Sequence, residues 1–362
     1  MEKVNQRLLE ALQPAWQTAL CGPAGSAQYV AAQTEVKQSR VEPLPQFLTA
    51  TAWHALRLAW RRKPEWVIAG SGLTAPIAWL ASRCAGGRVA VYLHGLDIVA
   101  PSRVYQWLWL PFIRRCDLVL VNSANTAMLA QNRGVDPGIT HVLHPGTYVP
   151  TLYEGAAHAF RAHHGFGQRP LLLSVGRLTQ RKGLVDFVMK ALPTVAASYP
   201  DVLLVVIGDE ASDALHARAG SERERILDAA RMGGVEKNLR FLGRCDDSTV
   251  SVAYQAADVH VFPVLELPGD VEGFGMVALE SAAHGLPTVA FAVGGVPDAV
   301  LDGYTGTLVE PGNYTALGEA VVRQLACARE SATIAACRAF ATGKAWSVFG
   351  ERLRNLLDSC HV

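Results

Sequence analysis

Short apolar runs alternate with longer amphipathic stretches along almost the whole chain. The runs are rich in Val, Ile and Leu, show no alternation with polar residues, and are followed by Gly, Asn or Pro. Runs of this kind, separated by helical patterns, are typical of parallel strands that are covered on both faces. We therefore expect strands at 67–69, 88–93, 118–121, 141–144, 171–175, 203–207, 239–242, 259–262, 288–291 and 307–309.

The expected strands fall into two groups, which predicts two doubly wound α/β domains. Between His144 and Pro170 the chain is rich in Gly, Pro, Tyr and His, and we place the boundary there. The expected domains are 1–165 and 166–345. Ligands of such sheets bind beyond the carboxyl ends of the strands. The loops that follow the strands, facing a cleft between the domains, are therefore where we look for chemistry.

Composition excludes several classes of protein. Half of the 362 residues are apolar and 18% are charged, which excludes a disordered or fibrous chain. The net charge of +1 excludes a polycationic nucleic-acid binder, and we expect no nucleic-acid partner. Residues 1–168 nevertheless hold 15 Lys and Arg against 9 Asp and Glu, a charge of +6, and the remainder holds 18 against 23. The first half therefore favours an anionic partner.

The seven cysteines are scattered and never spaced C-x-x-C. This pattern predicts free thiols in a reducing cytoplasm and neither a zinc site nor a disulfide framework. The first residues, MEKVNQRLLEAL, form a polar amphipathic pattern without the apolar region of a signal peptide. No run of about 18 apolar residues occurs, so we expect a cytoplasmic protein without a membrane span.

Two cations follow the expected strand 171–175, in the sequence LLLSVGRLTQRKG. Gly176 ends the strand, and Arg177 and Lys182 precede the next helix. Arg offers phosphate oxygens a planar fork and Lys a compact charge, and a helix N-terminus also attracts anions. This arrangement favours a phosphate site. The alternative is a solvated basic loop.

Two acids flank the start of a later helix, in VEGFGMVALESAAHGLP. Glu272 precedes the helix expected over 276–284, and Glu280 lies within it. Gly273 and Gly275 allow close backbone approach, so the first helical N–H groups can meet a phosphate. The acids would repel phosphate, but they can accept hydrogen bonds from the vicinal hydroxyls of a sugar and a ribose. The alternative is a helix-start acid favoured by the dipole and a surface Glu.

These motifs and their order resemble those of the retaining glycosyltransferases of family 4, which have the GT-B fold. The resemblance covers nearly all of residues 170–325 and includes VGRLTQRKG, VVIGDE, LRFLGRC and EGFGMVALESAAHGLPTVAFAVGGVPD. It implies two Rossmann-like domains facing a central cleft and a last helix, 346–362, that crosses back to the first domain. It also implies a nucleotide-diphosphate sugar as donor substrate, with no metal and no other cofactor.

The resemblance implies roles for the donor residues. Arg177 and Lys182 would bind the diphosphate, Glu280 the ribose hydroxyls and Glu272 the donor sugar. The expected donor-binding residues are Gly176, Arg177, Lys182, Gly243, Arg244, Glu272, Gly273, Phe274, Gly275, Met276 and Glu280.

Two further stretches of the second half enter by the same resemblance. Backbone amides around Phe274 and Gly275 would meet sugar hydroxyls and phosphate, and Gly243 with Arg244 would line the nucleotide base. The segment 265–271 is longer than the family pattern, and we expect it to reshape the sugar pocket.

In the first half, the expected strand 88–93 ends in HGLD. The resemblance implies that His94 lies at the donor sugar, that Gly95 allows close approach, and that Asp97 holds the loop or assists the acceptor. Asn122 and Ser123 would line the acceptor side, although Ser123 could equally be the N-cap of the following helix. A lone His after a strand is otherwise more often structural. The expected catalytic residues are His94, Glu272, Arg177 and Lys182.

A competing motif follows the expected strand 67–69. Residues 70–75, GSGLTA, satisfy the G-x-G-x-x-A fingerprint of dinucleotide binding. That reading needs an acid at the end of the next strand, where this chain has His94 and Gly95. We therefore do not expect a nicotinamide cofactor.

The segments 53–66 and 105–115 mix Trp, Leu and Arg as helices at a lipid interface do. Together with the charge of +6 they predict docking on an anionic membrane, at the inner face of the cell membrane, to reach a lipid-linked acceptor. The alternative is that the aromatic side chains are core and the cations are solvated. The N-terminal helix resembles the one that in relatives follows a first strand and a glycine loop, so we expect the first domain to lack that strand.

The resemblance thus implies a retaining hexosyltransferase that moves a sugar from a GDP- or UDP-linked donor to a saccharide or lipid-linked saccharide. Cell-surface polysaccharide or lipopolysaccharide biosynthesis is the expected setting. The resemblance implies a front-face route, in which the leaving phosphate helps to deprotonate the acceptor. Two alternatives remain: a non-catalytic partner that binds sugar nucleotide, and a sugar-nucleotide epimerase on the same fold.

Overall fold

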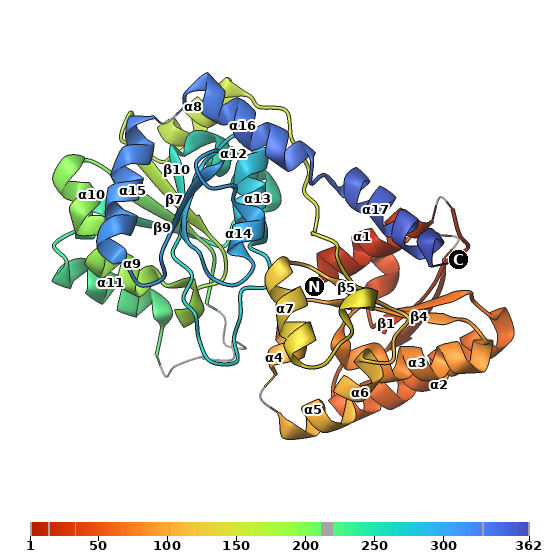
Figure 1. Cartoon of the computed structure of the whole chain (residues 1–362). Coiled ribbons are helices and arrows are strands. Elements are labelled where there is room, and N and C mark those ends of the chain that lie inside the picture. Colours follow the sequence, from red (N-terminus) through yellow and green to blue (C-terminus); the bar gives the residue numbers. More distant parts are fainter. Residues whose placement is uncertain are drawn as a thin grey trace. The chain divides into compact units, whose positions relative to one another are not determined.

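The computed structural model describes residues 2–13, 15–32, 34–100, 102–210, 220–327 and 329–360. It contains two compact units, one of Met1–Gly146 with Trp346–Val362 and one of Thr147–Ala345. Each unit is built on parallel strands connected by helices (Figure 1). The α/β class and the two doubly wound units predicted from the apolar runs are confirmed.

The second unit contains a six-stranded parallel sheet. Its strands are β7 (Leu171–Val175), β8 (Leu203–Ile207), β9 (Leu239–Gly243), β10 (Val259–Phe262), β11 (Thr288–Phe291) and β12 (Gly306–Val309). They lie in the order β12-β11-β10-β7-β8-β9. The order therefore reverses between β7 and β10, which are paired neighbours. In open α/β sheets the carboxyl ends of the strands at such a reversal are where ligands bind.

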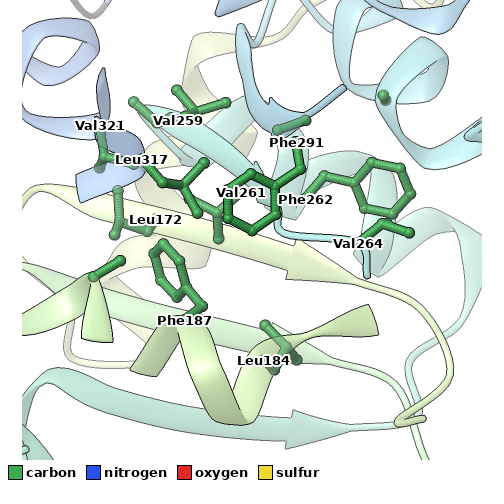
Figure 2. Packing of buried hydrophobic residues seen from close by; sticks show 14 of the residues in the cluster. Leu172, Leu184, Phe187, Val259, Val261, Phe262, Val264, Phe291, Leu317 and Val321 are labelled. Carbon is green, nitrogen blue, oxygen red and sulfur yellow. The ribbon is translucent and has the colours of Figure 1, made fainter. Parts of the chain in front are cut away.

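Helices cover both faces of this sheet. They are α8 (Glu154–His163), α9 (Leu184–Lys190), α10 (Leu192–Ser198), α11 (Glu222–Met232), α12 (Asp247–Ala256), α13 (Met276–Ala283), α14 (Val296–Ala299), α15 (Tyr314–Ala326) and α16 (Ser331–Thr342). Leu172 packs with Phe187 and Val261 on one face, as Figure 2 shows. Leu171 and Leu173 belong to a second cluster, because successive side chains of a strand point to opposite faces. Burial on both faces explains why the strand sequences are apolar without alternation.

The first unit contains two separate parallel sheets. The larger has β3 (Trp66–Ala69), β4 (Arg88–Leu93), β5 (Leu118–Val121) and β6 (Thr140–Val142) in that order. The smaller pairs β1 (Ala19–Pro23) with β2 (Glu35–Ser39). The helices are α1 (Glu2–Leu12), α2 (Leu44–Arg62), α3 (Ala75–Ala85), α4 (Leu96–Val99), α5 (Arg103–Leu108), α6 (Leu110–Ile113), α7 (Ala124–Asn132) and α17 (Trp346–Ser359).

The ten strands predicted from the sequence are all present, with bounds that differ by at most two residues. The strands β1 and β2 were not predicted. Their sequences, ALCGP and EVKQS, hold few apolar residues, and nearly all their side chains are partly or fully exposed. A two-stranded sheet of this kind leaves no apolar run that a pattern search can detect.

The boundary between the units falls after Gly146, inside the stretch expected between His144 and Pro170 but before residue 165, where the first domain was expected to end. The helix α8 packs against α12 of the second unit. Its Arg161 is 5% exposed and donates to the Asp258 carboxylate at 2.9 Å and to the carbonyl of Ala256 at 2.8 Å. A buried charge needs such partners, so α8 is held in the second unit.

The helix α17 lies in the first unit, where it packs against α1. Arg354 donates to the carbonyl of Ala11 at 2.8 Å, and Leu353 and Leu357 are buried. An apolar face and a hydrogen bond thus join two helices that are more than 300 residues apart in sequence, Arg354 and Ala11 being separated by 343 positions.

Candidate functional site

The loops after β7, β8 and β10 of the second unit lie in close backbone contact. Gly176 and Gly208, just beyond β7 and β8, both have φ of +143°. A Cβ on Gly208 would lie 1.8 Å from the Gly176 carbonyl oxygen, and a Cβ on Gly183 would lie 1.9 Å from that of Pro263. Only glycine allows these approaches. The loop 176–183 is therefore held between the ends of two neighbouring strands.

A network of four charged side chains lies at this sheet edge. Lys182 Nζ lies 2.9 Å from Oε2 of Glu272, and the Arg181 guanidinium contacts the same carboxylate. Arg181 Nε also lies 3.0 Å from Oδ1 of Asp270. The four side chains are only 10–16% exposed. Charge-assisted hydrogen bonds at such burial are stronger than those on an open surface.

The network sets the protonation of Glu272. Burial by itself raises the pKa of its carboxyl, but the charges of Lys182 and Arg181 outweigh burial and lower this pKa to about 2. Burial lowers the pKa of the Lys182 ammonium, although Glu272 opposes the shift. The ammonium also lies 4.5 Å from the centroid of the Phe262 ring. Glu272 is therefore an anion that two cations hold.

Sequence reasoning missed Arg181 and Asp270. Arg181 connects two loops, because its carbonyl accepts a hydrogen bond of 2.8 Å from the Leu265 amide while its side chain contacts Asp270 and Glu272. The segment 265–271, expected to reshape the sugar site, is therefore fixed to the cation loop through this one residue. The available signals were the adjacent cations in QRKG and the extra length of LELPGDV.

The helix α13 begins beside this network without a side-chain cap. Gly275 is its N-cap, with φ of +94°, and no side chain accepts from its first amides. Phe274 is 3% exposed and belongs to the core. The Gly295 amide donates to the Glu272 carbonyl at 2.8 Å, and a Cβ on Gly295 would lie 2.1 Å from the Gly273 carbonyl oxygen. Uncapped helical N–H groups can donate hydrogen bonds to an anion.

The remaining donor candidates lie along the same edge. Arg177 is exposed directly after Gly176, and Glu280 is half-buried within α13, which Met276 begins. Gly243 ends β9, two strands from β7, and its carbonyl accepts from the Gly208 amide at 2.9 Å. Arg244 is exposed beside it. The structure thus gathers Lys182, Glu272 and Gly275 closely and leaves Arg244 at the far end of the edge.

A second group of predicted residues surrounds His94 in the first unit. The ring Nε2 lies 3.0 Å from the Gly70 carbonyl oxygen, so this nitrogen carries the hydrogen. The backbone amide of His94 donates to Asp97 Oδ2 at 2.8 Å, and the Asn122 side chain donates to the His94 carbonyl at 3.1 Å. Burial lowers the pKa of His94 to about 4. The imidazole is therefore neutral at pH 7, with Nδ1 left as an acceptor.

The neighbours of His94 have local structural roles. Gly95 has φ of +100° and is the N-cap of α4. Burial raises the pKa of Asp97, even though the amides of His94 and Gly72 hydrogen-bond its carboxylate. Ser123 is fully buried and caps α7, accepting from the Thr126 amide at 3.1 Å. Of the two readings of Ser123, the structure shows the N-cap.

Other side chains of this chain fill the space beside two glycines of GSGLTA, Gly70 and Gly72. A Cβ on Gly70 would lie 2.7 Å from the Asn5 amide nitrogen. A Cβ on Gly72 would lie 2.5 Å from the Tyr105 hydroxyl and 3.0 Å from Cβ of Asp97. Their missing side chains make room for α1 and α5, which explains the motif without a dinucleotide.

The two segments rich in Trp and Arg are partly core and partly surface. In the segment 53–66, Trp53 and Trp60 are exposed, but Arg62 Nη2 lies 2.9 Å from Glu35 and Arg61 lies 3.8 Å from the same carboxylate. The strand β2, which was not predicted, thus supplies one carboxylate that both arginines contact.

In the segment 105–115, α6 contributes side chains to the core, whereas α5 exposes a Trp side chain on the surface. Leu110 and Ile113 of α6 are buried, and Trp109 donates to the Leu73 carbonyl at 2.9 Å. Trp107 of α5 is 79% exposed. None of the helices in the described ranges is long and apolar enough to cross a bilayer. Within the same ranges, no three His, Cys, Asp or Glu side chains are grouped to hold a metal ion.

Comparison with known families matches both units. The family described as Glycosyltransferase Family 4 matches residues 1–149, and the family described as Glycosyl transferases group 1 matches residues 157–336.

Two curated proteins are similar in sequence. A GDP-mannose-dependent alpha-(1-6)-phosphatidylinositol monomannoside mannosyltransferase from Mycolicibacterium smegmatis is 31% identical over 305 residues, which are 79% of this chain and 75% of the relative. A GDP-mannose-dependent monoacylated alpha-(1-6)-phosphatidylinositol monomannoside mannosyltransferase from Corynebacterium glutamicum is 34% identical over 194 residues. That second match covers 52% of this chain and 47% of the relative.

Two solved structures share the fold at low sequence identity. Anabaena Alr3699/HepE in complex with UDP has a TM-score of 0.82 at 20% identity, covering 99% of this chain and 96% of its own. WaaG, a glycosyltransferase involved in lipopolysaccharide biosynthesis, has a TM-score of 0.68 at 19% identity, covering 98% of this chain and 94% of its own. At these identities the likeness concerns the fold.

Proposed function

The chain belongs to the group 1 glycosyltransferases of family 4 and has their GT-B fold, and from this premise we propose that it transfers a sugar from a nucleoside diphosphate to a saccharide or lipid-linked saccharide. The observation that carries the proposal is the pairing of Lys182 with Glu272 beside the uncapped start of α13. Cations and helical amides at one point suit a leaving diphosphate, and the carboxylate suits sugar hydroxyls.

We propose a role in this transfer for the cations and acids of the donor site and for His94. Arg177 and Lys182 take the diphosphate oxygens and stabilise the charge that develops on the leaving group. Glu280 accepts from the ribose hydroxyls, and Glu272 orients the sugar. We propose that His94, neutral with Nδ1 available, accepts a hydrogen bond from a substrate hydroxyl. These cations make the leaving-group step possible without a metal ion.

We further propose that the anomeric configuration is retained. The described residues place no carboxylate other than Glu272 and Asp270 in the charge network, and both are held by Arg181. A carboxylate paired with two cations is a weak nucleophile, which favours a front-face route in which the leaving phosphate takes the acceptor proton. The stereochemistry of the product, read by NMR from a donor of known anomeric form, tests this step.

Donor choice is tested first with GDP-mannose, because the relative that is 31% identical is named for that donor, and then with UDP-glucose. Thermal unfolding with GDP and UDP reports nucleotide preference, since a ligand at about 100 times its dissociation constant stabilises by about 2.7 kcal/mol. Turnover measured with and without acceptors separates a transferase from the two alternatives. Binding without turnover indicates a non-catalytic partner, and conversion of donor alone indicates an epimerase.

For the acceptor we propose a lipid-linked saccharide reached from an anionic membrane surface, in cell-surface polysaccharide or lipopolysaccharide synthesis. The relative from Mycolicibacterium smegmatis is named for a phosphatidylinositol monomannoside. The first unit, counted as 1–146 and 346–362, holds 16 Lys and Arg against 10 Asp and Glu, a charge of +6. Transfer to lipid extracts compared with soluble saccharides tests this part of the proposal.

A further inference from the structure

A cationic groove of about 620 Å³ lies in the first unit, between α5, α6 and the end of α7. Arg103, Arg114 and Arg133 line it together with Trp107 and Gln106. Among the described residues, no Asp or Glu lines the groove. Three guanidinium groups without a carboxylate repel one another, and an anion placed between them would relieve that repulsion.

Two of the arginines are positioned by neutral oxygen atoms. Arg114 Nε donates to the Arg133 carbonyl at 2.7 Å, and Arg133 Nη1 donates to the Gln106 side chain at 3.1 Å. Gln106 is itself fixed by hydrogen bonds to the carbonyls of Ile98 and Ala100, at 3.1 and 2.9 Å. These contacts orient the guanidinium groups without cancelling their charge. By contrast, Arg61 and Arg62 of the same unit share the carboxylate of Glu35.

Apolar side chains stand exposed beside the groove, all on α5. Val104 is 62% exposed, Trp107 79% and Leu108 43%. Exposed apolar groups next to cations are typical of segments that enter the headgroup region of a bilayer, where Trp is enriched. A soluble phosphate would satisfy the arginines and leave these three side chains in water. A phospholipid surface satisfies both.

We propose that this groove binds the phosphate of an anionic phospholipid headgroup while Trp107 enters the lipid interface. Arginine forks match phosphate oxygens in pairs, and the groove offers three guanidinium groups. The inference rests on the membrane contact proposed above and gives it a site and a ligand chemistry. It does not depend on sugar transfer, and its test is read without any donor.

The test is sedimentation of the full chain with phosphatidylcholine vesicles that contain or lack phosphatidylglycerol. R103Q/R133Q should weaken binding to the anionic vesicles about thirtyfold, because anionic lipid attracts each surface Arg with about 1 kcal/mol. R61Q/R62Q removes the same charge from the same unit but outside the groove, and should weaken binding clearly less than R103Q/R133Q, since both side chains already contact Glu35. W107Q should weaken binding about tenfold through the loss of buried apolar area. R103Q alone tests the groove without touching the bond to Gln106.

Thermal unfolding of each variant shows that the fold is retained. Equal losses in R103Q/R133Q and R61Q/R62Q would overturn the groove, as would wild-type binding by R103Q/R133Q or no binding by the unmodified chain. Millimolar glycerol phosphate should release no more protein than chloride at the same ionic strength. Greater release would assign the arginines to a soluble phosphate and overturn the membrane ligand. None of these outcomes decides whether the chain transfers sugar, because that activity is measured separately.

Discussion

Arg181 contacts the carboxylate of Glu272, and Lys182, the next residue, contacts the same carboxylate at 2.9 Å. Two adjacent side chains thus hold one acid, while Arg181 also holds Asp270 at 3.0 Å. The two cations are not equivalent. Lys182 can contact an entering anion by giving up one contact, with Glu272. Arg181 contacts two carboxylates, both of them in the loop 265–272.

Replacing Arg181 should therefore affect the sugar more than the nucleotide. R181Q releases Asp270 and the segment 265–272, so we expect kcat/KM with the sugar donor to fall ten- to a hundredfold, about 1.4–2.7 kcal/mol. The affinity for the bare nucleoside diphosphate should change less than threefold. Steady-state kinetics and calorimetry measure the two. R181K should recover part of the loss, and R231Q, which removes an exposed arginine of the same unit, should behave as the unmodified chain.

Arg177 and Lys182, the cations proposed to bind the diphosphate, should determine the affinity for the nucleoside diphosphate. R177A and K182A each remove a charge-assisted contact, which is typically worth about 1.5–3 kcal/mol, so the nucleoside diphosphate should bind about ten- to a hundredfold more weakly. Calorimetry with GDP and UDP gives the affinities. A variant that binds the nucleotide as tightly as the unmodified chain would remove that residue from the site.

The two acids should separate by ligand. E280A loses the proposed ribose acceptor and should weaken the bare nucleotide and the sugar nucleotide alike. E272Q should lower turnover with the sugar donor and leave the affinity for the bare nucleotide nearly unchanged, since no sugar is present. Parallel titrations with both ligands check this. Identical effects of the two variants would contradict the division of roles.

Acid should destabilise the chain through Glu272. Because its pKa is lowered from 4.5 to about 2 in the fold, its contribution is complete above about pH 4.5 and is lost as the pH falls toward 2. The contribution is at most about 3 kcal/mol. Urea unfolding of the unmodified chain and of E272Q, from about pH 6 down to about pH 3, should show curves that converge as the pH falls. Parallel curves would mean that the carboxylate is not stabilised by its cations.

The pH dependence of kcat/KM should not show the titration of an exposed histidine. Burial lowers the pKa of His94 from 6.5 to about 4, so its imidazole stays neutral through the range where an exposed histidine takes up a proton. We expect kcat/KM to show no inflection from His94 between about pH 5 and 8. An inflection near 6.5 that disappears in H94Q would show that His94 is accessible to protons.

The parallel sheets could be predicted from the sequence because burial on both faces produces apolar runs such as Leu171–Val175 and Leu203–Ile207. The strand β2 could not, since EVKQS is half-exposed and polar. The contacts of its Glu35 with Arg61 and Arg62 could therefore not be predicted either. A charge on a helix cannot be assessed before its partner is placed.

The candidate site shows the same limit. Glycine and helix patterns indicated where Lys182 and Glu272 would lie, because strand ends and helix starts leave local signatures. Their contact spans 90 residues, and the clamp of Arg181 on Asp270 depends on the path of the segment 265–271. No local pattern determines the path of such a loop.

The packing of α17 on α1 has a consequence for synthesis on the ribosome. The second unit, Thr147–Ala345, is continuous in sequence and can complete its core as soon as it emerges. The first unit begins earlier but cannot bury the apolar face of α1 until Leu353 and Leu357 have been translated. The half of the molecule that is made first is thus finished last, and until then its exposed helix is the surface that a chaperone would meet.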